Sequence, residues 1–180
     1  MIAADTSEHL FWITSRAAGT ASLLLASAGM ALGLLMGGRL VKGRGLDLRA
    51  LHEALSLATL GALVVHAVSL LGDSFLKLSV ADIAIPFVSS YRQPWMAIGI
   101  IGGWAMLVLG LSYYARARIG VQRGRRLHRF SALAWLAGLA HALAMGTDAG
   151  RIWFLLAIAI VAVPALVLLV ARLSAEEAPA

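Results

Sequence analysis

Apolar and polar residues are arranged along this chain in long blocks. Five stretches are mostly apolar and contain no Asp, Glu, Lys or Arg; they cover 17–38, 54–72, 93–115, 130–147 and 152–171. A helix that crosses a membrane needs about 20 predominantly apolar residues. The pattern therefore predicts an all-α integral membrane protein, a helical bundle with five transmembrane helices, in which residues 1–180 form a single domain.

Composition agrees with this prediction and narrows the class of protein. Apolar residues make up 61% of the chain and charged residues 13%, whereas soluble domains carry about 45–50% and about 25%. These values exclude a soluble globule, a disordered chain and a nucleic-acid-binding domain, and they make the lipid bilayer the expected environment. The chain has no cysteine, which excludes disulfides, thiolate metal sites, iron–sulfur clusters and covalently attached haem.

The basic residues are unevenly placed between the apolar stretches. Ten of the 15 Lys and Arg residues lie in the segments 39–53 and 116–129. Basic loops stay on the cytoplasmic side of a membrane. We therefore expect the N-terminus outside, the C-terminus in the cytoplasm, and a multi-pass protein of the cell membrane, either a bacterial inner membrane or a plasma membrane.

One connecting segment, 73–92, is long but does not have the composition of a span. Charged residues are spaced through it and Pro86 interrupts it. We expect it to form a short amphipathic element along the outer membrane surface. It is either an ordinary loop or a lid over the outer half of the bundle.

Four of the five histidines fall on two of the predicted helices. His52 and His66 belong to the second, and His128 and His141 to the fourth. Each pair is separated by roughly 20 Å along its helix. Both helices leave a basic loop and so run in the same direction, which places His52 level with His128 near the inner face and His66 level with His141 nearer the outer face. Ionisable residues inside a span are functional candidates.

Paired imidazoles facing each other across a flat cavity are suited to be the axial ligands of a b-type haem. Such a haem is six-coordinate and serves electron transfer, and two stacked haems would form an electron path through the bilayer. Two other interpretations stay open: four unrelated buried histidines that hydrogen-bond between helices, and two separate mononuclear metal sites, the inner one completed by Glu53. A di-metal centre is disfavoured, because ligands about 20 Å apart along each helix cannot share one metal cluster.

Helical periodicity fits the first pair of histidines better than the second. Fourteen residues return a helix to within about 40° of its starting direction, so His52 and His66 share a face. Thirteen residues leave His128 and His141 about 140° apart. Either these two side chains approach their sites from different angles, or the helix is distorted, with Gly138 as the candidate position.

The spacings and the linking segments resemble those of a known family. The features are His52-x13-His66, His128-x12-His141, the run 15–19 (SRAAG), and the segments AIPFVSSYRQPW (84–95), RRLHRFS (125–131) and HALAMGTD (141–148). Together they resemble the ferric reductase-like transmembrane domain family. That family includes the membrane part of NADPH oxidases, ferric reductases, and the haem subunit of a bacterial periplasmic methionine sulfoxide reductase system.

The resemblance implies a ferric reductase-like transmembrane di-haem domain. It implies two b-type haems, the inner one held by His52 and His128 and the outer one by His66 and His141, with electrons passing from the cytoplasmic to the outer side. It also implies that Arg16 lies near the outer haem, as a propionate partner or an electron-exit residue. Compared with the family, we expect the additional N-terminal span of the larger members and the cytoplasmic FAD and NADPH domain of the oxidases to be absent, and the sequence has no nucleotide-binding glycine loop.

Three further sets of residues are candidates for supporting roles. Arg129 could pair with a propionate of the inner haem, or it could be an ordinary cytoplasmic charge. Trp135 could fill the gap between the haems and couple them, or it could pack in the core of the bundle. Glycines of the first and third stretches suit the close approach of a helix or a haem face; they are Gly29, Gly33, Gly99, Gly102 and Gly103.

These observations predict a transmembrane di-haem b-type cytochrome, the electron-transfer component of an oxidoreductase. The expected donor is a separate cytoplasmic flavoprotein reductase or a membrane quinol. The expected acceptor lies on the outer side and is ferric iron, oxygen, a quinone or a redox protein. No residue is assigned an acid–base catalytic role, and no FAD or NAD site is expected. The alternatives are a quinol-coupled cytochrome b that anchors a larger oxidoreductase, and a non-redox membrane scaffold or transporter.

Overall fold

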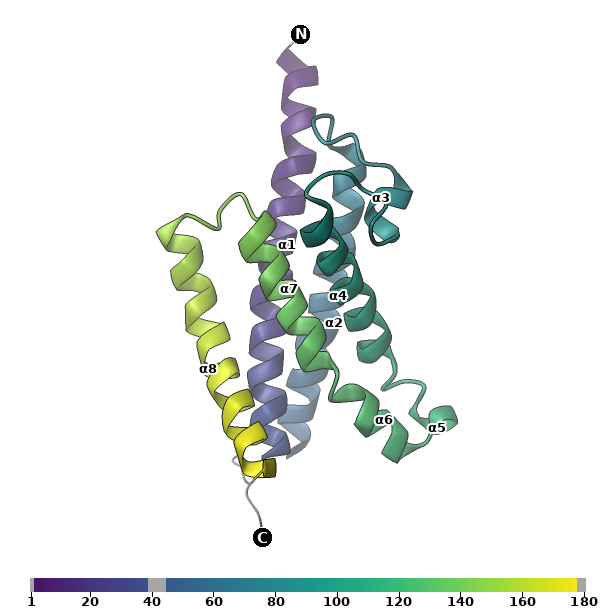
Figure 1. The fold of residues 1–180 in the computed structure, drawn as a ribbon, viewed down its shortest axis with the longest axis vertical. Helices are drawn as coiled ribbons and strands as arrows, with labels where there is room; N and C mark the ends of the chain where they lie inside the picture. The colour runs from purple at the N-terminus through teal and green to yellow at the C-terminus, as the bar shows by residue number, and fades with distance from the viewer. Residues whose placement is uncertain (1, 39–44, 178–180) are drawn as a thin grey trace.

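The computed structural model describes residues 2–38 and 45–177, and every regular element in these ranges is helical. The elements are α1 (Ile2–Gly37), α2 (Gly45–Ser69), the 3₁₀ turn η1 (Leu70–Gly72), α3 (Val80–Ala84), α4 (Gln93–Leu111), α5 (Arg116–Ile119), α6 (Val121–His128), α7 (Ser131–Met145) and α8 (Ile152–Glu177) (Figure 1). The prediction of an all-α helical bundle is confirmed for this part of the chain.

Four of the helices are long and apolar enough to cross a membrane. The candidate spans are His9–Gly37, Asp47–Gly72, Gln93–Leu111 and Ile152–Ala175, and they make the chain a multi-pass membrane protein. The predicted span 130–147 corresponds to α7, which has only 15 residues. At 1.5 Å per residue α7 is about 22 Å long, against a hydrocarbon core of about 30 Å.

The ends of the helices differ from those of the charge-free stretches. The first helix begins at Ile2, not near residue 17, and α2 begins at Gly45, not near residue 54. Absence of charge marks the part of a helix that suits lipid, but Lys, Arg and Glu are themselves good helix formers. The helices therefore extend past the apolar stretches into charged sequence.

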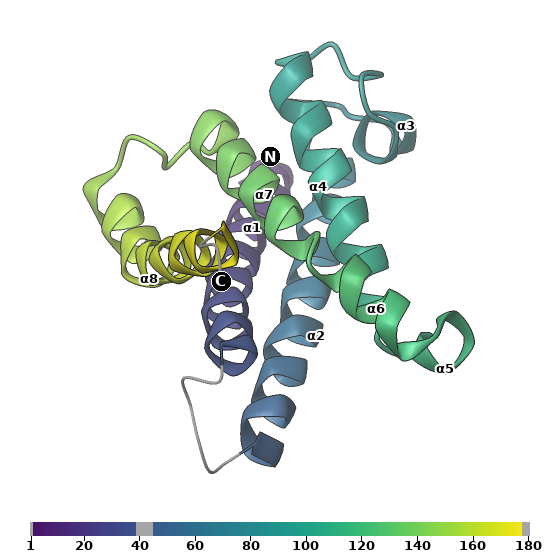
Figure 2. The ribbon, with the colours of Figure 1, turned by 60° about the horizontal axis from the view of Figure 1, so that its bottom comes forward.

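Helix α1 lies at the centre of the bundle and packs against α2, α7 and α8, while α4 packs against α7 (Figures 1 and 2). A buried apolar cluster joins α1, α7 and α8; its members are Leu23, Trp135, Phe154, Ile158, Ala162 and Ala165. Many other large apolar side chains are exposed, including Val108 and Ile160, at 62% and 72%. Lipid tails are as apolar as leucine, so such an exterior suits a membrane.

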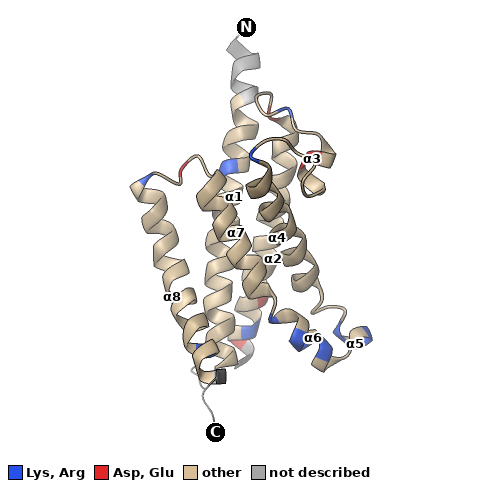
Figure 3. Ribbon diagram, viewed as in Figure 1, with Lys and Arg blue, Asp and Glu red and all other residues tan. Residues whose placement is uncertain are grey.

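The two ends of the bundle differ in charge. We call the end that carries α5, α6 and the start of α2 the arginine end, and the opposite one the N-terminal end (Figure 3). Six arginines lie on or beside α5 and α6, at positions 116, 118, 123, 125, 126 and 129. The basic residues of 39–44 lie outside the described residues.

The segment 73–92 is folded against α4 at the N-terminal end and, as predicted, is not a span. Its short helix α3 is capped by Ser79, whose hydroxyl and backbone N–H both bond the Asp82 carboxylate. These hydrogen bonds hold the pKa of Asp82 below its usual value. Two hydrogen bonds tie the segment to α4: Trp104 Nε1 donates to the Ala84 carbonyl and Gln93 Nε2 to the Phe87 carbonyl, each at 2.8 Å. A lid function stays a prediction.

Candidate functional site

The ring of His66, on α2, is held against the backbone of α1. Its Nδ1 lies 2.8 Å from the Ser15 carbonyl oxygen, and the Ser15 hydroxyl donates to the His66 carbonyl at 3.0 Å. One turn further along α1, a Cβ atom added to Gly19 would lie 2.8 Å from the same Nδ1. That distance is shorter than a van der Waals contact, so the ring occupies the space that only glycine leaves.

The same arrangement recurs at His52, fourteen residues earlier on α2. The His52 Nδ1 lies 3.1 Å from the Gly29 carbonyl oxygen, and a Cβ on Gly33 would lie 3.1 Å from its Cε1. The carbonyl and glycine positions on α1 have also moved by fourteen residues. Because α1 and α2 run antiparallel, the shared spacing produces two equivalent sites, one at each depth.

The third case joins two other helices. The His141 Nδ1, on α7, lies 2.8 Å from the Trp95 carbonyl oxygen of α4, and a Cβ on Gly99 would overlap the His141 ring. We call this arrangement, in which residue i supplies a carbonyl to the imidazole Nδ1 and residue i+4 is a glycine under the ring, the carbonyl–glycine notch. Three of the four predicted ligand histidines, His52, His66 and His141, lie in such a notch.

The notch sets the chemistry of each ring. A carbonyl oxygen only accepts hydrogen bonds, so the bond requires Nδ1 to carry the proton. In the neutral imidazole the lone pair then lies on Nε2. A backbone carbonyl bonded to one ring nitrogen is the arrangement that fixes the tautomer and orientation of a metal-ligating histidine. The notches therefore hold His52, His66 and His141 in the form that a metal ligand needs.

His128 is held differently. It is the last residue of α6, its side chain is exposed, and the helix breaks at Arg129–Phe130 before α7 begins. The break removes the angular separation of about 140° that one regular helix would impose on His128 and His141. The predicted distortion is thus present, but placing it at Gly138 was wrong, because Gly138 lies within the regular helix α7.

The four rings form two groups at different depths. The centres of the His52 and His128 rings are 6.1 Å apart, with their planes at 85°, at the arginine end. His66 and His141 lie nearer the N-terminal end, each in its own notch. The two histidines of α2 are about 21 Å apart along the helix. The structure therefore brings the rings of His52 and His128 together, as the sequence predicts.

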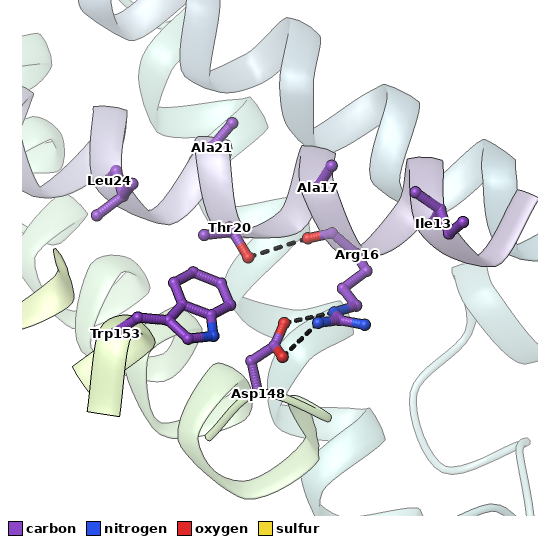
Figure 4. A pocket seen from close by; sticks show the side chains of 8 residues that line it. All are labelled: Ile13, Arg16, Ala17, Thr20, Ala21, Leu24, Asp148 and Trp153. Atoms are coloured by element: carbon purple, nitrogen blue, oxygen red, sulfur yellow. Dashed lines mark hydrogen bonds and ion pairs between the residues drawn. The ribbon is translucent and has the colours of Figure 1, made fainter. Parts of the chain in front are cut away.

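Arg16 is paired with a carboxylate from a distant part of the chain. Its Nε and Nη2 both donate to the two oxygens of Asp148, and its guanidinium lies 4.7 Å from the centre of the Trp12 ring. The pair forms part of the wall of a hollow of about 460 Å³ (Figure 4). The hollow is lined by Ile13, Arg16, Ala17, Thr20, Ala21, Leu24, Asp148 and Trp153. The sequence alone did not identify Asp148 as the partner of Arg16.

Replacing Arg16 should lower the unfolding free energy more than replacing its partner Asp148. Asp148 is only 6% exposed, whereas Arg16 is 37% exposed. Arg16→Gln leaves a buried carboxylate without its partner, so we expect a loss of about 2–4 kcal/mol in unfolding free energy. Asp148→Asn leaves a solvated guanidinium and should cost less, as should the double variant. Thermal unfolding of the three variants in detergent measures this; equal losses in both single variants would contradict it.

Trp135 is buried in the apolar cluster between α1, α7 and α8. It is 1% exposed, and its indole Nε1 donates to the Ser27 hydroxyl at 2.9 Å. These contacts favour the packing role over the haem-coupling role. Trp135→Phe should lower the unfolding free energy by about 1–2 kcal/mol and leave cofactor content unchanged. Trp153→Phe, at a half-exposed ring, is the matched control, and a larger loss from that variant would contradict the assignment.

One of the other candidate glycines, Gly102, lies where two helices come close together. Gly102 allows α4 to approach α7, since a Cβ there would lie 3.1 Å from the Ala137 Cβ.

Glu53 accepts a hydrogen bond of 2.5 Å from the Tyr114 hydroxyl, which raises the pKa of Tyr114. In the described part of the chain no three His, Cys, Asp or Glu side chains form a metal-binding group. Nothing therefore supports Glu53 as a third ligand at the inner histidines.

Comparison of the chain with protein-family models, curated protein sequences and solved structures returns no match in any of the three. Membership of the ferric reductase-like family stays a prediction that rests on the quoted motifs.

Proposed function

We propose that the chain is a transmembrane di-haem cytochrome b, with His52 and His128 as ligands of the inner haem and His66 and His141 as ligands of the outer haem. The observation that carries the proposal is the carbonyl–glycine notch. A histidine that served only to join two helices through Nδ1 would not need its Nε2 lone pair held in one orientation. Three separate notches that all leave Nε2 with the lone pair favour ligation.

The residues present fit such a group. Imidazole nitrogens bind metals at about 2 Å, so two rings on opposite sides of one ion have centres about 6 Å apart. The 6.1 Å between the His52 and His128 ring centres agrees with this. When bound, each haem would be held by the two histidines of its pair and would supply one-electron chemistry. The chain would bind and orient each group through its histidines and exclude water with apolar helices.

Two arginines are the candidates for pairing with haem propionates. Arg129 directly follows His128, and Arg16 directly follows Ser15, the carbonyl partner of His66. The Arg16 Nε and Nη2 are bonded to Asp148, so a propionate would bind the guanidinium through Nη1. We propose that Arg129 serves the inner group and Arg16 the outer one.

We also propose that α7 is a fifth span. A short apolar helix can be accommodated by local thinning of the bilayer and by flanking residues. Five crossings, with the arginine end in the cytoplasm, put the N-terminus outside and the C-terminus inside the cell membrane. Electrons would then enter at His52 and His128 and leave at His66 and His141. The donor would be a flavoprotein or a quinol, and the acceptor ferric iron, oxygen or a redox protein.

Electron transfer across vesicles tests this function. The purified protein is reconstituted into lipid vesicles that enclose ferricyanide, and dithionite is added outside. Because neither reagent crosses the bilayer readily, we expect ferricyanide to be reduced at least tenfold faster than in vesicles without protein, and His66→Ala to abolish the gain. Equal rates with and without protein would contradict the proposal and favour a non-redox scaffold.

A further inference from the structure

A second candidate site lies on α6 and does not involve the histidine rings. Three arginines and one glutamine surround a hollow of about 270 Å³ at the arginine end; they are Gln122, Arg125, Arg126 and Arg129. We call it the basic hollow. Four hydrogen-bonding side chains, three of them cationic, thus converge on one small space.

Among the described residues, no ion pair joins these arginines to an acidic side chain, and the Arg16–Asp148 pair lies at the other end of the bundle. Like charges three or four residues apart on a helix repel each other, as do Arg125 and Arg129. An anion in the hollow would relieve this repulsion.

The surroundings of the basic hollow indicate where that anion comes from. Helices α5 and α6 follow the candidate span Gln93–Leu111 and extend away from the rest of the bundle (Figures 1 and 2). Apolar side chains on this arm are exposed: Val121 at 58%, Leu127 at 43% and Phe130 at 57%. A helix with both exposed apolar residues and a cluster of arginines lies in the interface of a membrane, with arginines at the headgroups.

We propose that the basic hollow binds the phosphate group of an anionic phospholipid in the leaflet that meets the arginine end. The guanidinium groups of Arg125 and Arg126 would bind the phosphate through paired N–H donors, and the Gln122 amide would add a further donor. Arg129 then stays with the inner propionate proposed above. The exposed apolar residues of the same arm would lie against the acyl chains. The ligand class is thus a phosphate monoanion that carries hydrocarbon, such as phosphatidylglycerol.

Lipid binding at this place would also fix a histidine. His128 ends α6, and the notch that holds the other three rings is not observed at this one. A phospholipid that ties α6 to the membrane surface would restrict the position of the His128 side chain. The lipid site itself does not depend on haem, so its test can succeed or fail independently of the proposed function.

Two double variants with the same change in charge provide the test. Arg125→Gln with Arg126→Gln removes two arginines of the basic hollow, while Arg118→Gln with Arg123→Gln removes two from the same arm outside it. A charge-assisted hydrogen bond to the phosphate contributes about a tenfold gain in affinity. We expect short-chain phosphatidylglycerol, titrated onto the full-length protein in detergent and followed by native mass spectrometry, to bind about 100-fold more weakly to the first double variant. The second double variant should bind nearly as the parent does.

Several results would overturn the proposal. Equal weakening in both double variants would mean a diffuse attraction to the arm, and no weakening in either would leave an acidic protein as the occupant. Inorganic phosphate that competes at the lipid's own concentration would indicate a soluble anion. Loss of haem in the first double variant with unchanged lipid binding would assign the basic hollow to a propionate. If that variant fails to fold, Arg125→Lys with Arg126→Lys keeps the charge and should still bind more weakly than the parent.

Discussion

Replacing His66 by alanine is expected to remove one of two haems and to leave the other in place and reducible. The variant loses a ligand at the N-terminal end only, because His52 lies about 21 Å away along α2 and His128 lies beside His52. The haem content of the purified protein, measured by pyridine haemochrome, should fall by half. Alanine at His9, an exposed residue of α1, is the matched control and should leave the content unchanged.

Two outcomes of the His66 experiment would be informative against the assignment. If both haems disappeared while circular dichroism showed an intact helical fold, the pairing of ligands by depth would be wrong. If neither disappeared, His66 would be a structural histidine, with its Nδ1 bond to Ser15 as its role. His141→Ala should reproduce the His66 result, since both belong to the same proposed site.

Adding a single methyl group at Gly99 is expected to have nearly the same effect as removing a ligand. A Cβ there would overlap the His141 ring, so the ring must leave the notch and its Nδ1 must leave the Trp95 carbonyl. We expect Gly99→Ala to lose most of the outer haem and to retain the inner one. The haemochrome assay and the reduced absorption spectrum measure this loss.

Gly138→Ala is the matched control for Gly99→Ala. Gly138 lies one turn before His141, on the same helix, and a Cβ there meets no atom within 4 Å. Alanine in place of a helical glycine stabilises a helix by up to about 1 kcal/mol, so this variant should keep both haems and unfold at an equal or higher temperature. Haem loss in both variants would show that the effect comes from the helix and not from the notch.

The depth of the histidines could be predicted from sequence because it depends only on where each one lies relative to the start of its apolar stretch. The helix ends could not, because charge marks the limits of the hydrocarbon contact and not of the hydrogen-bonded helix. Thus α1 extends to Ile2 and α2 to Gly45, well beyond the apolar stretches. The predicted span 130–147 differs in the opposite direction, since its helix α7 has 15 residues and is shorter than the apolar stretch.

The notches were not predicted, although one part of their signal is present in the sequence. A carbonyl has no sequence signature, because every residue supplies one. The glycines do have one: Gly19 and Gly33 are fourteen residues apart on α1, the same spacing as His52 and His66 on α2. Two antiparallel helices with equal spacings of small and large residues bring each histidine onto a glycine, so matched glycine and histidine spacings are a signal that the amino-acid sequence itself carries.

The geometry of the second histidine pair could be predicted only in part. Periodicity alone indicated that His128 and His141 could not share a face of one regular helix. Glycine is a usual cause of a kink, which made Gly138 the candidate. The break instead falls at Arg129–Phe130, where charged sequence meets the apolar helix. The contact between Arg16 and Asp148 was beyond sequence reasoning, because the two lie 132 residues apart in the chain.

The number of haems bound per chain tests the central claim most directly. The full-length protein is purified in detergent from haem-sufficient cells, and its haemochrome content is compared with protein concentration from amino-acid analysis. The account predicts two b-type haems per chain, both reduced by dithionite. A folded protein with no haem would contradict the di-haem proposal, and one haem per chain would leave one histidine pair structural and end the electron path across the membrane.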